Sequence, residues 1–341
     1  MGRSGTTLID KLLSNHPKID VLSQPFPLIF VSLKKKYLGV LGKDQYYVLN
    51  QHLHDENFSQ DKFDQFLDNV TFDKNYLQSI FNNMKHYSGQ TIKPSYPIVE
   101  NLEMDLSGLD GIYKSSIELF DVKDSYYIGS KEIMCEEFLP YFIKNNYKTI
   151  LVYRDPRDII ASINYPKSKK YLGNKKPTLF LLRTWKKSIR YLNSLRGNKN
   201  FFFIKYEDLI NRPYKNLNKI TDFLDISSFQ DNQFDHGIYD RDGSLWNANS
   251  SKDKEISSIS SNSIESYKKC LSLEEIHYIE SICNKDMKQL GYNFETTPSI
   301  EAISQFKDYD IEDSKELDKM FSSLKNNIDF EVKEFKENED C

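Results

Sequence analysis

The sequence is poor in the residues and runs that mark several protein classes. Its 341 residues hold only four cysteines, with no Cys-x-x-Cys pair and no Cys/His spacing typical of a metal site. No apolar run reaches 18 residues, and the start lacks the apolar stretch of a signal peptide. These absences argue against a disulfide-rich secreted domain, a zinc module and a transmembrane segment. They favour a cytoplasmic protein with reduced thiols.

An excess of either charge is also missing from most of the chain. The formal net charge is −4, and residues 301–341 hold 13 Asp/Glu and 6 Lys, so the preceding 300 residues carry +3. No basic cluster of the kind that binds nucleic acid is present. The weakly basic body suits a small anionic ligand. We expect residues 296–341 to form an acidic, solvated tail with some helix.

A loop of small residues opens the chain and runs directly into a helical pattern that ends near Asn15. Such a loop presents backbone N–H groups and the positive end of a helix dipole, which together bind phosphate. An ordinary helix N-terminus is the alternative interpretation. The predicted cradle consists of Arg3, Ser4, Gly5, Thr6 and Thr7.

The cradle differs from the phosphate loop of a kinase. A Walker loop has a Lys directly after its second Gly, whereas here Thr6 follows Gly5. The sequence therefore favours a nucleotide whose distal group carries less charge than a triphosphate. A nucleotide-dependent kinase stays an alternative.

Two further segments deliver polar side chains to the ends of predicted strands. Residues 126–131 read as a strand that ends at Lys131, followed by a helix over 133–144, and residues 148–153 form a near-continuous apolar run before Arg154. Asp155 and Pro156 then begin a helix, as N-cap and first residue, with Ser162 two turns inside it. Because ligands bind at strand C-terminal ends in such sheets, these side chains are candidate ligand contacts.

Read together, the Arg-Ser-Gly-Thr-Thr loop and the Arg154–Ser162 segment resemble the two donor-binding motifs of the sulfotransferase family, over roughly residues 1–295. That family uses 3′-phosphoadenosine-5′-phosphosulfate. The resemblance implies that the loop binds the 5′-phosphosulfate, that Arg154 and Ser162 bind the 3′-phosphate, and that Lys131 stabilises the breaking bond. It further implies donor contacts for Tyr206 near adenine, Ser250 and Ser251 in a closing loop, and Lys268 at a phosphate.

The chain departs from the family at the general base. Many relatives have a Glu at the end of the strand 19–22, where this sequence has Gln24. An amide cannot take a proton at neutral pH. We expect the base to come from residues 34–115, a helical and loop insert on the acceptor side with helices near 61–69 and 73–87. Its candidates are His52 and His54, and we take His54 as the base.

The predicted fold is α/β, a parallel sheet flanked by helices and similar to that of P-loop NTPases. Only one residue precedes Gly2, so the strand that such a loop normally follows is missing from the recorded start. We therefore expect Met1 to be an internal Met, unless another segment fills the central position.

The sequence as a whole predicts an enzyme that moves a sulfuryl group to a hydroxyl or amine. The acceptor, a small molecule or a glycan, is not identified by any motif. No metal is expected, because no acidic ligand pattern is present and a sulfuryl group needs little neutralisation. Besides the kinase, a nucleotide-binding relative without catalysis stays open, because of Gln24 and the missing first strand.

Overall fold

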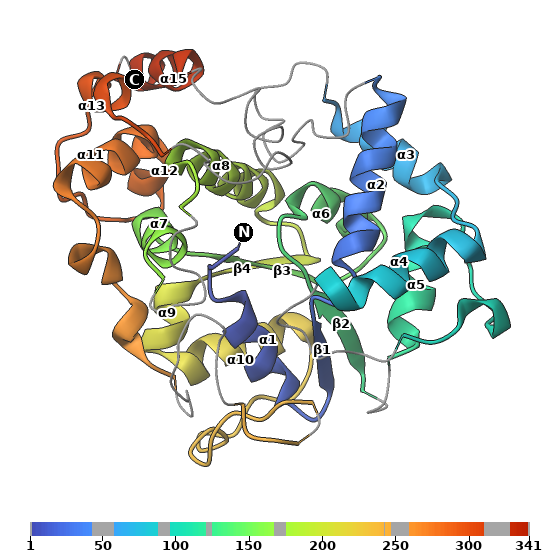
Figure 1. Cartoon of the computed structure of the whole chain (residues 1–341). Coiled ribbons are helices and arrows are strands. Elements are labelled where there is room, and N and C mark those ends of the chain that lie inside the picture. The colour runs from blue at the N-terminus through green and yellow to red at the C-terminus, as the bar shows by residue number, and fades with distance from the viewer. Residues whose placement is uncertain are drawn as a thin grey trace.

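The protein is a mixed α/β structure, described here from a computed structural model (Figure 1). The structure describes residues 2–42, 58–87, 96–120, 125–166, 175–241, 243–246, 259–309 and 328–339. The strands are β1 (Ile19–Ser23), β2 (Tyr127–Lys131), β3 (Thr149–Tyr153) and β4 (Phe201–Lys205). The helices of the first half are α1 (Thr6–Ser14), α2 (Pro27–Val40), α3 (Gln60–Asn69), α4 (Lys74–Tyr87), η2 (Val99–Asn101), α5 (Gly108–Glu118), η3 (Glu136–Phe138) and α6 (Leu139–Lys144). Those of the second half are α7 (Pro156–Asn164), α8 (Thr178–Leu195), α9 (Tyr206–Asn211), α10 (Pro213–Leu224), η5 (Ser261–Ser263), η6 (Ser266–Lys269), α11 (Leu273–Ile282), α12 (Asn284–Gln289), α13 (Ile300–Gln305) and α15 (Asp329–Glu339).

The strands form two parallel pairs. β1 pairs with β2 so that Ser23 lies opposite Lys131, and β3 pairs with β4 so that Tyr153 lies opposite Lys205. Within the described ranges no strand joins the two pairs, so the structure shows two small parallel sheets where we predicted one. The expected strand before Gly2 stays a prediction. The residues that directly follow the strands of both pairs contribute to the candidate functional site.

Helices cover the β3–β4 pair from both sides (Figure 1). α6 and α8 contact β3, while α9 and α10 contact β4. The amphipathic spacing of apolar residues in α8 turns one face toward the core, where Trp185 is buried. This packing fixes the ends of β3 and β4, where Arg154 and Tyr206 follow.

The insert forms a helical body with its own core. α2 contacts α3 and α4, and α3 contacts α5. These helices pack around aromatic rings; the Phe63 ring centroid, for example, lies 4.8 Å from that of Tyr37 and 5.1 Å from that of Phe138. The predicted helices near 61–69 and 73–87 are confirmed as α3 and α4. The sequence did not predict α2 and α5.

Two predicted helices are interrupted. The helix expected over 133–144 begins only at η3, because Met134 has a φ of 58°, which a right-handed helix cannot accommodate. The apolar spacing of residues 272–290 also predicts one continuous helix, but the structure divides it into α11 and α12 at Cys283. The first interruption matters most, since it leaves Glu132 in an irregular segment after β2.

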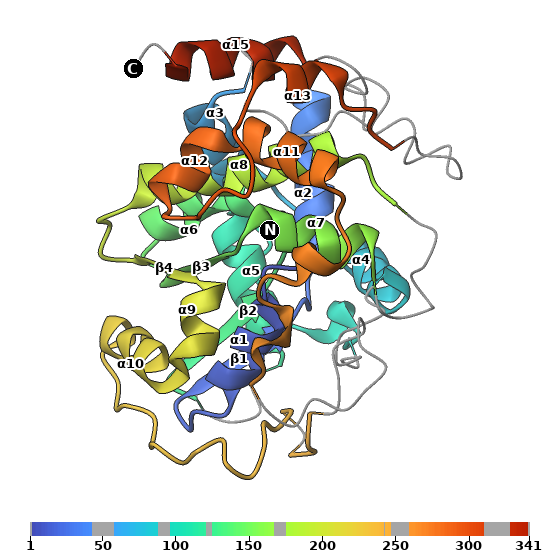
Figure 2. The same ribbon diagram turned by 90° about the vertical axis from the view of Figure 1, so that its left-hand side faces the viewer.

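The C-terminal segment is not a solvated appendage in its described parts. α13 and α15 pack against α11 (Figure 2), and Ile303 and Phe335 are 1% and 5% exposed. Arg183 of α8 donates to both carboxylate oxygens of Glu331, at 2.7 and 2.9 Å, in the buried interface. The expectation of a solvated tail is wrong there, because these apolar and paired charged side chains face the domain. Among the described helices, none is long and apolar enough to cross a membrane.

Candidate active site

The loop before α1 is shaped by a single glycine. Gly5 is the N-cap of α1 with a φ of 85°, and no side chain caps the helix there. A Cβ at Gly5 would lie 2.2 Å from Cδ2 of Tyr206. Only glycine fits this position, and the close approach places the Tyr206 ring against the start of the helix. The Leu8 N–H of the first turn donates to the Gly5 carbonyl at 3.0 Å. The N–H groups of Thr6 and Thr7 precede it at the start of α1, where helix geometry supplies no carbonyl and a phosphate can bind.

Arg154 lies at the centre of the site, directly after β3. Its guanidinium donates from Nη1 to the carbonyl of Arg3 at 3.1 Å and from Nη2 to the carbonyl of Ser263. It also lies 4.6 Å from the centroid of the Tyr206 ring, whose hydroxyl is 3.2 Å from Ser263 Oγ. Asp158 is 3.6 Å from Nη2. Arg154 is therefore a buried cation that joins the N-terminal loop to the segment around η5.

The predicted partner of Arg154 is close by. Ser162, two turns into α7, accepts a 3.1 Å hydrogen bond from Nε of Arg3. Arg3 has a φ of 63° and contacts both members of the predicted pair, Arg154 through its carbonyl and Ser162 through its side chain. The structure thus brings Arg3 into one cluster with Arg154 and Ser162, which follow it in the chain by 151 and 159 positions.

Lys131 lies at the other sheet, beside the start of α1. Its Nζ is 3.5 Å from Thr7 Oγ1, 3.3 Å from Gln24 Oε1 and 3.6 Å from Asp10 Oδ2. Burial lowers the pKa of Lys131, and the neighbouring Asp10 carboxylate opposes that shift. Burial likewise raises the pKa of Asp10 to about 6, against the pull of Lys131. An ammonium held at a helix N-terminus can stabilise an anionic leaving group.

Two carboxylates of this region were not predicted from the sequence. Asp10 accepts from Ser23 Oγ at 2.9 Å and so holds Lys131 in place. Glu132 accepts from the backbone N–H of Phe26 at 2.9 Å. Its position directly after Lys131 was the only signal in the sequence, and a Glu after a strand is too common to single out.

Other predicted residues lie elsewhere or outside the described ranges. Ser4 is fully buried in the loop. Lys268 is 43% exposed and pairs with Glu265 and Glu295, each at 3.0 Å, rather than with the cradle. His54, His52, Ser250 and Ser251 fall outside the residues that the structure describes.

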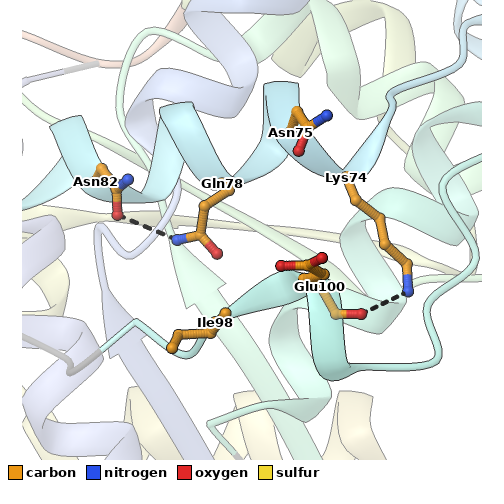
Figure 3. A pocket seen from close by; sticks show the side chains of 6 residues that line it. All are labelled: Lys74, Asn75, Gln78, Asn82, Ile98 and Glu100. Atoms are coloured by element: carbon orange, nitrogen blue, oxygen red, sulfur yellow. Dashed lines mark hydrogen bonds between the residues drawn. The ribbon is translucent and has the colours of Figure 1, made fainter.

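A surface cavity lies on the insert (Figure 3), and no residue of this cluster lines it. It has a volume of about 290 Å³ and is lined by α4 and the segment around η2. Two of its side chains are engaged within the protein: Lys74 donates to the carbonyls of Glu100 and Leu102, and Gln78 accepts from Val99 N–H at 2.7 Å. The cluster at the two strand ends, which contains the residues of the sequence motifs, is therefore our candidate active site.

The comparison with known families agrees with the motifs. The sulfotransferase domain profile matches residues 1–291, which includes every described residue of the cluster. The chain belongs to the sulfotransferase family. It is therefore a sulfotransferase enzyme, as the loop and the Arg154–Ser162 segment predicted.

Solved sulfotransferase structures resemble this one over most of its length. A sulfotransferase domain from the curacin biosynthetic pathway is 18% identical, with a TM-score of 0.47, and the match covers 86% of this chain and 95% of that one. A sulfotransferase from Mycobacterium avium is 14% identical, with a TM-score of 0.37, covering 87% and 76%. Among curated proteins, none matches this chain. The assignment of this sulfotransferase rests on the domain match and on its own residues.

Proposed function

We propose that this sulfotransferase takes its sulfuryl group from 3′-phosphoadenosine-5′-phosphosulfate, on a sheet of the P-loop type. The observation that supports the proposal is the contact of Arg3 with both Arg154 and Ser162. Two anion-binding segments, far apart in the chain, form one cluster at the start of α1. A ligand with two separate anionic groups suits this arrangement, because Lys131 and Thr7 lie at the neighbouring sheet.

Each residue then has a role. The first-turn N–H groups of α1 and the Thr7 hydroxyl bind the 5′-phosphate, and Arg154 with Ser162 binds the 3′-phosphate. Lys131 stabilises the charge that develops on the bridging oxygen as the sulfur–oxygen bond breaks. The acceptor hydroxyl or amine attacks the sulfur in line from the opposite side. Catalysis is mostly positioning and charge stabilisation, as in phosphoryl transfer.

The acceptor binds on the side of the insert, between α2 and the end of β2, in this proposal. α2 begins at Pro27, directly after Phe26, whose N–H contacts Glu132. The helical body therefore reaches the transfer site through the N-terminus of α2. We expect a small-molecule or glycan acceptor there.

Calorimetry with 3′-phosphoadenosine-5′-phosphate tests the donor. We expect the wild type to bind it without Mg²⁺ and more tightly than ATP with Mg²⁺. Arg154→Ala should weaken binding by roughly 10- to 150-fold, because it removes charge-assisted hydrogen bonds worth about 1.5–3 kcal/mol. Arg212→Ala is the matched control, since Arg212 is exposed on the surface.

Unchanged affinity in a folded Arg154→Ala protein would contradict the proposed 3′-phosphate site. Tighter binding of ATP with Mg²⁺ would favour the kinase alternative. Binding of the product nucleotide without consumption of the donor in a single-turnover assay would favour the inactive relative.

A further inference from the structure

One carboxylate at the end of β2 is only half satisfied. Glu132 Oε1 accepts the 2.9 Å hydrogen bond from Phe26 N–H. Its other oxygen, Oε2, is buried, and no donor among the described residues reaches it. A buried carboxylate oxygen without a hydrogen bond is costly, so such an oxygen needs a donor that the described residues do not supply.

In the chain, Glu132 lies next to residues that we propose to hold the sulfuryl donor. β1 and β2 are neighbours, with Ser23 opposite Lys131, and Gln24 N–H donates to the Lys131 carbonyl at 2.8 Å. Glu132 therefore follows directly on the strand end whose ammonium contacts Gln24 and Thr7. Its carboxylate lies at the backbone of Phe26, two residues after the amide that cannot act as a base.

Asp10, the other carboxylate of this region, is already engaged. It lies 3.6 Å from Lys131 Nζ and accepts from Ser23 Oγ at 2.9 Å. Moving a proton to Asp10 would remove the charge that holds Lys131. Glu132 has no cation within ion-pair distance in the described part of the chain, so it can gain a proton without breaking such a pair.

We propose that Glu132 is the general base of this enzyme, with Oε2 accepting the proton of the acceptor hydroxyl. The proposal rests on the proposed function. The acceptor O–H bond breaks as its proton moves to Glu132, and the acceptor oxygen forms a bond to sulfur. The bond from sulfur to the bridging oxygen breaks, and its electron pair stays with the 5′-phosphate beside Lys131. The products are the sulfate ester, 3′-phosphoadenosine-5′-phosphate and protonated Glu132, which returns its proton to water.

The surroundings of Glu132 set the pH dependence. Tyr113 of α5 and Tyr96 before η2 face it from the insert, and Lys131 and Cys135 face it from its own segment. Burial raises the pKa of Glu132 to about 8, opposed by the Phe26 hydrogen bond and by Lys131. A base must be ionised to act, so the transfer rate should rise with pH through about 8.

Glu132→Gln tests the role of Glu132 as a base separately from its hydrogen bond with Phe26. The Gln carbonyl can still accept from Phe26 N–H, but an amide cannot take a proton. The assay is single-turnover transfer from sulfur-35-labelled donor to water and to a series of phenols from 4-nitrophenol to 4-methoxyphenol. We expect a loss of roughly 10²- to 10⁴-fold in rate, largest for the least acidic phenol, and loss of the rise near pH 8. Affinity for 3′-phosphoadenosine-5′-phosphate should stay unchanged.

Two further variants complete the test. Glu274→Gln, on the exposed start of α11, should keep the wild-type rate and pH profile. If Glu132→Gln does not fold, Glu132→Asp replaces it, and a reduced rate that keeps the pH-dependent rise is expected.

The outcomes are distinguishable. A folded Glu132→Gln protein with the wild-type rate and pH profile overturns the role of Glu132 and leaves the proposed function intact. A Glu132→Asp protein with no change in rate has the same meaning. A wild type that neither binds 3′-phosphoadenosine-5′-phosphate nor consumes the donor with any acceptor overturns both.

Discussion

At Lys131 the side chain is held by three oxygens from two segments, two from successive turns of α1 and one from the turn after β1. Thr7, Gln24 and Asp10 all lie within 3.6 Å of its ammonium. In the proposed reaction the charge that Lys131 stabilises develops only as the donor bond breaks. Its effect is therefore expected on the rate more than on ground-state binding.

Lys131→Ala should lower the single-turnover rate by about 10²–10³-fold while product-nucleotide affinity changes only a few-fold. Rapid-quench kinetics and calorimetry measure the two quantities. Lys288→Ala, an exposed lysine of α12, is the control. Weakened binding with a normal chemical step would show that Lys131 is a phosphate contact instead.

Gly5 offers a sharper test of local geometry. Gly5→Ala combines a left-handed φ with a clash against Tyr206, and we expect about 2–5 kcal/mol of lost stability together with weaker nucleotide binding. Gly197→Ala is matched to it, with a φ of 87° and no atom within 4 Å of the added Cβ. Chemical denaturation should show a much smaller loss for Gly197→Ala. Equal losses would mean that Tyr206 moves away freely.

At the scale of the element, α15 is attached through a buried ion pair. Glu331→Gln removes the carboxylate charge from the buried pair with Arg183, which should cost about 3–5 kcal/mol in the free energy of unfolding. Glu337→Gln on the same helix is the control, since its pair with Lys333 is 3.9 Å long and exposed. That control should change stability by less than about 0.5 kcal/mol. A native-like stability for Glu331→Gln in urea would show that α15 detaches at little cost.

The elements of the two sheets could be predicted well from the sequence. β3 and β4 come from near-continuous apolar runs, and Asp155 with Pro156 marked the start of α7. The ends of β2 and β3 also identified Lys131 and Arg154 as candidate site residues, because ligands bind at the C-terminal ends of strands in such sheets. α2 could not be predicted: its apolar residues 28–31 are contiguous and read equally well as a buried strand.

The contacts around the site were harder to predict than its motifs. Asp10 lies inside a helix and Ser263 in a short turn, so no periodicity sets either apart. The tail was misjudged from its net charge, because a charge count cannot show that Glu331 has a buried partner. Pairing across more than 100 residues depends on tertiary packing, which local patterns do not encode.

At the scale of the whole molecule, the proposed donor would contact both strand pairs at once. Lys131 belongs to the β1–β2 side, whereas Arg154 and Tyr206 belong to the β3–β4 side. A ligand that binds only the folded state at a hundredfold excess over Kd adds about 2.7 kcal/mol of stability. We therefore expect 3′-phosphoadenosine-5′-phosphate to raise Tm and to slow amide exchange in both pairs.

Hydrogen exchange followed by mass spectrometry checks this expectation, with Arg154→Ala as the variant that should lose the protection. Protection limited to the β3–β4 pair would contradict a shared site.

The hydrogen bond between Trp185 and the active-site strand has a spectroscopic consequence. The sequence has two tryptophans, both buried, and the indole N–H of Trp185 donates to the Arg154 carbonyl at 2.9 Å. An indole in such a place emits at short wavelength, and its emission responds to small displacements of the carbonyl beside it. With Trp246→Phe, Trp185 becomes the sole emitter. The protein then reports occupancy at Arg154 through its own fluorescence, in real time and without a label.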